Sequence, residues 1–176
     1  MPYISSANIA CGFHAGSPLI MARTVRMAKK ADVAVGAHPS YPDLEGFGRR
    51  EMNLAPEELE AMVLYQIGAL EAICQAEGAA LEHVKPHGAL YNQAARDIHL
   101  AAAIARAVRR FSPHLVLFGL AGSKLIAAGL DAGLLVAREA FTDRAYMPDG
   151  SLMPRSLPGA VLEDPQLVMM NALQLA

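Results

Sequence analysis

Short runs of β-branched and other apolar residues alternate along the chain with longer segments whose apolar positions recur at helical spacing. The runs that predict strands cover residues 4–10, 33–37, 81–85, 114–118 and 134–140. After the first run, Met21, Val25 and Ala28 fall on one helical face, which indicates an amphipathic helix. A repeated order of strand, turn and helix is typical of a parallel sheet, because parallel neighbours need a crossover longer than a hairpin loop.

Helix starts can be placed from the residues that precede the helical patterns. Ser17 and Asp97 offer side-chain oxygens that can cap the helices following them, whereas Ala55 offers none. Proline suits the first helical position, because the amide there has no partner within the helix. The expected helices begin near Pro18, Pro56, Ile98 and Pro165.

Two long segments carry no regular pattern. Residues 39–54 are rich in glycine, proline and charge, and residues 141–158 contain the turn signal Pro148-Asp149-Gly150. Loops of this length are uncommon unless they have a function. A very short strand at residues 161–162 would bring the strands to six, still short of a closed eight-stranded barrel of about 250 residues. We therefore expect a single α/β domain over residues 1–176 whose sheet is open or lacks strands.

Composition narrows the class of protein. The 176 residues are 53% hydrophobic and 18% charged, which fits a globular domain and excludes a disordered chain. The net charge is −2 and the basic pairs are scattered, so we expect no nucleic-acid partner. No apolar stretch is free enough of polar residues to span a membrane. Cys11 and Cys74 form no CxxC motif, which is typical of a reducing compartment, and we expect a cytoplasmic protein.

Three histidines follow three successive predicted strands. His14 comes after the first strand, His38 after the second and His87 after the third, with Lys85 beside the last. The segment 143–146, which holds an aspartate, an arginine and a tyrosine, follows the fifth strand. The carboxyl ends of parallel strands converge on one face of the sheet. We therefore expect these side chains to share one pocket.

The residue types in this pocket leave two kinds of chemistry open. Imidazoles can move protons near neutral pH or, when neutral, bind a divalent metal, for which Asp143 or Asp43 would be a further ligand. The alternative is a metal-free site in which histidine is the base and cationic side chains are electrostatic clamps. A partly desolvated Lys85 favours a carboxylate ligand. The arginines that could grip carboxylate or phosphate are Arg49, Arg50, Arg144 and Arg155.

Other polar residues are expected to be structural. His83, His99 and His114 lie at a strand start or near helix ends and turns, and Cys11 is expected to be a small buried thiol. Residues 119–124 lack the spacing and the Lys-Ser order of a phosphate loop. They predict a strand-to-helix turn.

Several blocks of the sequence resemble the LamB/YcsF family. Residues 7–16 read Ala-Asn-Ile-Ala-Cys-Gly-Phe-His-Ala-Gly, residues 36–39 read Gly-Ala-His-Pro, residues 85–92 read Lys-Pro-His-Gly-Ala-Leu-Tyr-Asn, and residues 143–146 read Asp-Arg-Ala-Tyr. Segments 46–50 and 154–160 also match, so the resemblance covers nearly the whole chain.

The resemblance implies a seven-stranded βα barrel of the glycoside hydrolase/deacetylase type. It implies one subunit of an ATP-hydrolysing 5-oxoprolinase that acts with two partner subunits, B and C, to open 5-oxo-L-proline to L-glutamate. In this interpretation His14, His38 and His87 activate water or move protons, and Asp143 orients one of them. The residues implied to bind substrate are Asn8, Arg49, Lys85, Tyr91, Asn92 and Arg144.

The sequence departs from the family pattern at both ends. The Asp-Leu-Asn-Cys-Asp-x-Gly-Glu strand and the Val-His-Gly-Asp segment of the family do not occur in it. We therefore expect the chain to lack the N-terminal strand and the C-terminal strands, which leaves sheet edges that a partner or a second copy could cover. Two alternatives stay open: a non-catalytic scaffold subunit that binds a small carboxylate, and a metal-dependent carbohydrate deacetylase.

Overall fold

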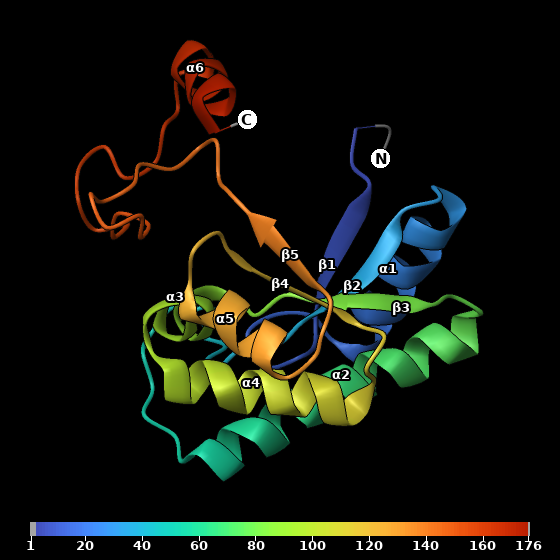
Figure 1. Ribbon diagram of the computed structural model, residues 1–176. Coiled ribbons are helices and arrows are strands. Elements are labelled where there is room, and N and C mark those ends of the chain that lie inside the picture. The colour runs from blue at the N-terminus through green and yellow to red at the C-terminus, as the bar shows by residue number, and fades with distance from the viewer. Residues whose placement is uncertain (1–2, 176) are drawn as a thin grey trace.

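The structure of the protein is a computed structural model that describes residues 3–175. Its centre is one five-stranded sheet in which all neighbouring strands are parallel and follow the order of the chain (Figure 1). The strands are β1 (Ser6–Ala10), β2 (Ala34–His38), β3 (Leu81–Val84), β4 (Val116–Leu120) and β5 (Val136–Glu139). The predicted α/β class with a parallel sheet is confirmed.

Helices connect the strands and continue past the last one. They are α1 (Pro18–Lys30), α2 (Pro56–Glu77), α3 (Gly88–Arg96), α4 (Ile98–Phe111), α5 (Lys124–Asp131) and α6 (Pro165–Leu175). The four predicted starts are confirmed. Ser17 caps α1 by accepting from the amide of Ile20, and Asp97 caps α4 by accepting from two amides. Ala55 makes no side-chain cap bond to α2.

Some predicted boundaries differ from the structure. The fourth strand begins at Val116 rather than at residue 114, because His114 lies in a turn in which its amide donates to the Ser112 hydroxyl. Helix α3 was not predicted. It starts at Gly88, and its N-cap residue, His87, makes no side-chain cap bond, so the usual sequence signal for a helix start is missing. The predicted strand at residues 161–162 is a single bridge between Val161 and Arg144.

The apolar core lies between the sheet and its helices. Helices α2, α4 and α5 lie on one side of the sheet (Figure 1). Leu59, Ile67 and Leu70 of α2 and Ile104 of α4 are fully buried with strand residues such as Val84. Each such side chain contributes about 1.5–3 kcal/mol when it leaves water. Successive strand residues point to opposite faces, so alternate positions carry side chains to the face away from these helices.

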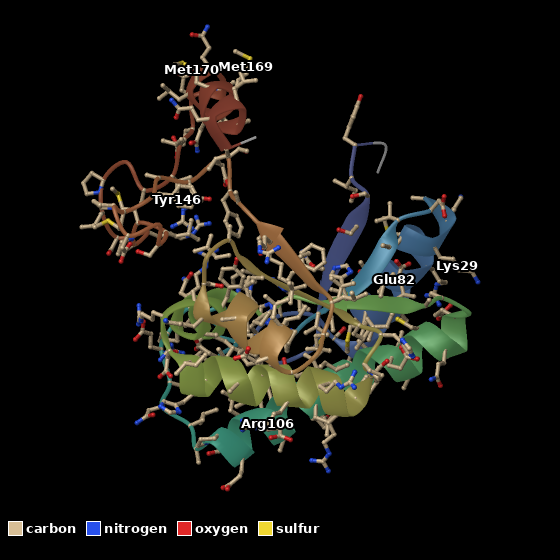
Figure 2. The ribbon with its side chains drawn as sticks, viewed as in Figure 1. Lys29, Glu82, Arg106, Tyr146, Met169 and Met170 are labelled. Carbon is tan, nitrogen blue, oxygen red and sulfur yellow. The ribbon has the colours of Figure 1, made fainter. Side chains whose placement is uncertain are left out.

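Helix α6 stands apart from the rest of the domain (Figure 1), and none of the residues described in it is buried. Met169 and Met170, labelled in Figure 2, are exposed. The Asn171 side chain donates to the backbone carbonyls of Thr142 and Arg144 and so ties the helix to the segment after β5. Among the described helices, none combines the length and the apolar character needed to cross a membrane.

Candidate active site

The three histidines predicted to share a pocket do come together. His14 lies in the turn between β1 and α1, His38 is the last residue of β2, and His87 precedes α3. In the parallel register Ala10 lies opposite His38, so the loops after β1 and β2 leave the sheet at the same level. One ring nitrogen from each histidine lies within 4.8 Å of the others.

Two of these rings are oriented by hydrogen bonds to backbone carbonyls. His38 Nδ1 lies 2.6 Å from the carbonyl oxygen of Lys85, and His87 Nε2 lies 2.9 Å from the carbonyl oxygen of Phe47. A carbonyl oxygen can only accept, so both nitrogens donate. His38 Nε2 and His87 Nδ1 then face each other at 2.9 Å. These carbonyls orient the rings of His38 and His87.

His14 completes the cluster from inside the fold. Its ring stacks on His87 at a centroid distance of 4.0 Å and an interplanar angle of 9°. The edge of Phe47 approaches it at 5.4 Å. The residue is buried, and its Nδ1 has no hydrogen-bond partner among residues 3–175. An unpaired buried nitrogen is costly unless a ligand meets it.

The environment favours the neutral form of all three rings. Desolvation, with a smaller contribution from His87, lowers the pKa of His14 to about 4. Desolvation first, and His87 second, lower the pKa of His38 to about 3. Burial also lowers the pKa of His87. Near pH 7 the cluster therefore offers neutral imidazoles, which can accept a proton from water or bind a divalent metal.

The long loop after β2 carries Phe47 to the cluster and is held by an aspartate. The Asp43 side chain is fully buried and accepts from the Gly46 amide, the Arg50 amide and the Arg50 guanidinium. The side-chain bond from Arg50 is the main reason why the pKa of Asp43 is lowered to about 2. Asp43 is thus committed to this loop rather than to the histidines, and Arg50 is paired.

Lys85 is also paired, with a residue that sequence reasoning missed. Its ammonium group lies 2.6 Å from Glu139 Oε2, and the side chains are 15% and 17% exposed. The same nitrogen lies 4.8 Å from the Phe141 ring centroid and 5.9 Å from that of Tyr91. Glu139 ends β5, so its position at a strand carboxyl end was a signal for the site.

Two oxygens beside this ion pair are buried and unsatisfied. Glu139 Oε1 and the Tyr91 hydroxyl have no hydrogen-bond partner within the part of the chain that the structure describes. Burial first, and the nearby Glu139 carboxylate second, raise the pKa of Tyr91. One acceptor and one donor therefore lie beside the Lys85–Glu139 ion pair.

The remaining predicted site residues lie at the rim or in supporting contacts. The Asn8 carboxamide oxygen lies 2.9 Å from His83 Nε2. Arg144 is buried and donates to the carbonyls of Ala160 and Met153. Asp143 and Asn92 are exposed. Arg49 is exposed, and its guanidinium lies 5.3 Å from the Phe47 ring centroid.

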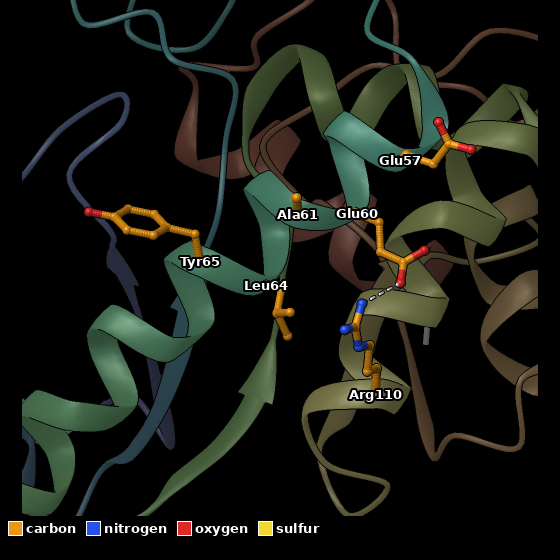
Figure 3. Close-up of a pocket in the computed structure, with 6 residues that line it drawn as sticks. All are labelled: Glu57, Glu60, Ala61, Leu64, Tyr65 and Arg110. Carbon is orange, nitrogen blue, oxygen red and sulfur yellow. Dashed lines mark ion pairs between the residues drawn. The ribbon is translucent and has the colours of Figure 1, made fainter.

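Two surface hollows lie elsewhere on the molecule. The first, of about 440 Å³, lies over α2 and α4 and contains the ion pair of Arg110 with Glu60 (Figure 3). The second, of about 420 Å³, includes the starts of β2 and β3 and therefore lies at the amino ends of the strands. Neither is lined by the three histidines, so we place the candidate site by its chemistry rather than by the size of a hollow.

Comparison with known proteins gives a consistent set of relatives. A sequence model of the LamB/YcsF family matches residues 1–176. The A subunit of 5-oxoprolinase from Clostridium beijerinckii is 55% identical over 98% of this chain and 68% of its own length. That of Symbiobacterium thermophilum is 61% identical over 94% of this chain and 64% of its own length. The chain thus spans about two thirds of these curated relatives.

A solved structure is also similar. The crystal structure of a lactam utilization protein from Thermus thermophilus aligns with a TM-score of 0.93 at 55% sequence identity. The alignment covers 99% of this chain and 71% of the other. The arrangement of the five parallel strands is therefore shared with a protein whose structure has been determined.

Proposed function

Since the chain belongs to the LamB/YcsF family, we propose that it provides the imidazole site of a multi-subunit 5-oxoprolinase. This enzyme would hydrolyse 5-oxo-L-proline to L-glutamate together with ATP, and two partner subunits would complete it. The observation that carries the proposal is the cluster of three neutral imidazoles, one of which has a buried nitrogen with no partner among the described residues. It occurs in a chain 55–61% identical to proteins named as the A subunit of 5-oxoprolinase.

Coupling to ATP has a chemical reason. A five-membered lactam is an unactivated amide, and its carbonyl carbon is a poor electrophile. Transfer of a phosphoryl group from ATP to the lactam oxygen would make that carbon open to attack by water. Cleavage of the ring C–N bond then gives an acyl phosphate, and a second water releases phosphate and L-glutamate. Binding of ATP by the assembled enzyme is part of the proposal.

The histidines can serve the water and proton steps of this reaction. His14, whose buried Nδ1 has no partner among the described residues, would activate the attacking water. His87 lies against His14 and its Nδ1 faces His38 Nε2 at 2.9 Å. The imidazole that takes the proton would return it to the lactam nitrogen as the C–N bond breaks. A positioned base of this kind contributes about 10²–10⁴-fold to a rate.

Substrate contacts are proposed for the residues around the cluster. Tyr91 and Glu139 offer a donor and an acceptor that match the carbonyl and the N–H of a lactam. Arg49 at the rim is the exposed cation suited to a carboxylate or phosphate. Lys85 forms an ion pair with Glu139, so it would position the Glu139 carboxylate rather than bind an anionic group of the substrate by itself.

We also propose that the five strands form one part of a seven-stranded βα barrel in the whole protein. The sequential parallel order and the side chains on the face away from the helices support this arrangement. Residues 1–176 would then belong to a single barrel domain. The structure of a full-length relative, superposed on these strands, tests this point.

The function is tested by reconstitution with the two partner subunits. We expect His14→Asn to lower glutamate and phosphate release by at least roughly 10²-fold, while circular dichroism and thermal unfolding stay close to wild type. His99→Asn, in an exposed histidine of α4, is the matched control and should leave turnover unchanged.

Three outcomes would contradict this proposal. Wild-type turnover in the folded His14→Asn variant would remove the cluster from catalysis. Full turnover by the partner subunits without this chain would show that the chemistry belongs to the partners, and this chain would then be a non-catalytic subunit. Release of acetate from acetylated sugars without ATP, in place of lactam opening, would favour a deacetylase.

A further inference from the structure

We propose that His14, His38 and His87 bind one divalent transition-metal ion of the zinc class. The inference names a ligand for the site used in the proposed function and in that sense rests on it. Binding of the metal can be measured in the absence of substrate and partner subunits.

The tautomers of His38 and His87 leave two lone pairs facing each other. Carbonyl oxygens at 2.6 and 2.9 Å fix the protons on His38 Nδ1 and His87 Nε2. In two neutral rings the remaining nitrogens, His38 Nε2 and His87 Nδ1, both carry lone pairs. They face each other at 2.9 Å. Two facing lone pairs repel unless a positive charge lies between or beside them.

A shared proton or a metal ion could supply that charge. A third proton on the pair would make a buried imidazolium, which desolvation disfavours. A metal ion instead needs neutral imidazoles whose other ring nitrogens donate to carbonyls or carboxylates, because these partners fix the tautomer and the ring orientation. The contacts with Lys85 and Phe47 have this form. The observations therefore favour the metal.

The third ligand is His14. Its buried Nδ1 has no partner among the described residues, and one nitrogen of its ring falls within the 4.8 Å cluster. Bonds from nitrogen to zinc of about 2.0–2.1 Å in tetrahedral geometry place two ligand atoms roughly 3.3 Å apart, so His38 Nε2 and His87 Nδ1, at 2.9 Å, need to separate only slightly to hold one ion. Parallel stacked rings cannot both aim in their planes at one ion, so His14 must turn from its stack on His87 when the metal binds.

The donor set also indicates the class of metal. Within residues 3–175 the cluster consists of three histidines and includes no carboxylate. Imidazole nitrogen suits zinc, copper, nickel or iron, whereas magnesium and calcium prefer oxygen ligands. Three imidazoles leave a coordination position that water or a substrate oxygen can take. We therefore expect Zn²⁺ or Co²⁺ to bind and Mg²⁺ not to compete.

The test measures binding to the complete chain. Protein stripped with EDTA is titrated with ZnCl₂ by calorimetry, and metal content after gel filtration is measured by mass spectrometry. We expect one zinc per chain, and affinity lowered by at least roughly 100-fold in His14→Gln and in His38→Gln. His99→Gln is the matched control and should bind like wild type.

A measurement on the wild type keeps the proposal falsifiable even if a variant fails to fold. X-ray absorption at the zinc edge should show the scattering pattern of coordinated imidazole. No saturable binding, wild-type affinity in both variants, or a zinc environment of oxygen alone would overturn the inference. Zinc binding without lactam turnover would contradict the proposed function alone.

Discussion

Lys85 and Glu139 meet across the intervening strand β4, with 2.6 Å between the ammonium nitrogen and a carboxylate oxygen. Lys85 directly follows β3 and Glu139 ends β5. The pair joins the carboxyl ends of two strands that are not neighbours, and the second Glu139 oxygen is buried with no hydrogen-bond partner in the described part of the chain. Lys85, which we expected to bind an anionic ligand, is therefore already neutralised by Glu139. A ligand that binds here contacts an ion pair rather than an isolated cation.

Removing one member of this pair should be costly. We expect Lys85→Met to lower the free energy of unfolding by about 2–3 kcal/mol, because it leaves the Glu139 carboxylate mostly out of water without its partner. Urea denaturation at pH 7 measures the loss. The double variant Lys85→Met/Glu139→Leu should recover much of it, since both charges are then gone. A double variant as unstable as the sum of the two single variants would contradict coupling between these side chains.

Gly36 makes room for His83. A Cβ atom at position 36 would overlap the imidazole of His83, which is buried and bonded to Asn8. We expect Gly36→Ala to destabilise the chain by about 1–3 kcal/mol through overpacking. Gly68→Ala is the matched control, because the nearest atom to its Cβ is 3.8 Å away in Phe111 and the site is inside α2. That change should stabilise by about 0.5–1 kcal/mol. Equal effects in thermal unfolding would show that His83 is free to move.

The hydrogen bond between Asp43 and Arg50 should make the free energy of unfolding depend on pH in the acidic range. The pKa of Asp43 is lowered from 3.8 to about 2, chiefly by the side-chain bond from Arg50. Because the folded-state pKa lies below that of the unfolded chain, the ionised carboxylate stabilises the fold above about pH 4. This contribution is lost as the pH falls from about 4 towards 2.

We therefore expect Asp43→Asn to be less stable than wild type at pH 7, with a gap that shrinks as the pH is lowered through this range. Urea denaturation at a series of pH values measures the gap. Asp131→Asn, in an exposed aspartate at the end of α5, is the control. A gap that stays constant down to pH 3 would mean that the carboxylate charge is not what holds the loop.

Gln66 anchors the start of the loop that carries Phe47. Its fully buried side chain accepts from the Ser40 amide and donates to the Ser40 carbonyl, both at 2.9 Å. Gln66→Leu would leave these two backbone groups buried and unpaired, so we expect a loss of about 2–3 kcal/mol. Gln75→Leu, on the exposed part of the same helix, should change stability by less than about 0.5 kcal/mol. Chemical denaturation of both variants gives the comparison, and similar values would contradict the anchoring role.

Much of the fold and part of the site could be predicted from the sequence because the signals are local. Ser17 and Asp97 sit where helix caps are needed, and His14, His38 and His87 each follow a recognisable strand. Parallel topology then brings distant histidines together without further information. The conclusion that they would meet required only the order of strands.

The rest depends on contacts between segments far apart in the sequence. Nothing near Gln66 or Ser40 indicates that one would bind the other. The pairing that neutralises Lys85 crosses a whole strand to reach Glu139. The partners of His38 and His87 are backbone carbonyls, which every residue possesses, so the identities of Lys85 and Phe47 carry no signal for them.

Phe47 has a positive φ of 54°, and its carbonyl oxygen accepts from His87. This oxygen decides which side of the imidazole holds the hydrogen. Rotation of that single peptide plane would release the hydrogen to the opposite nitrogen and exchange the donor and acceptor sides of the ring. The conformation of a surface loop and the reactivity of the histidines are thus mechanically linked. A molecule that presses on the loop could alter the chemistry of the cluster without touching any imidazole.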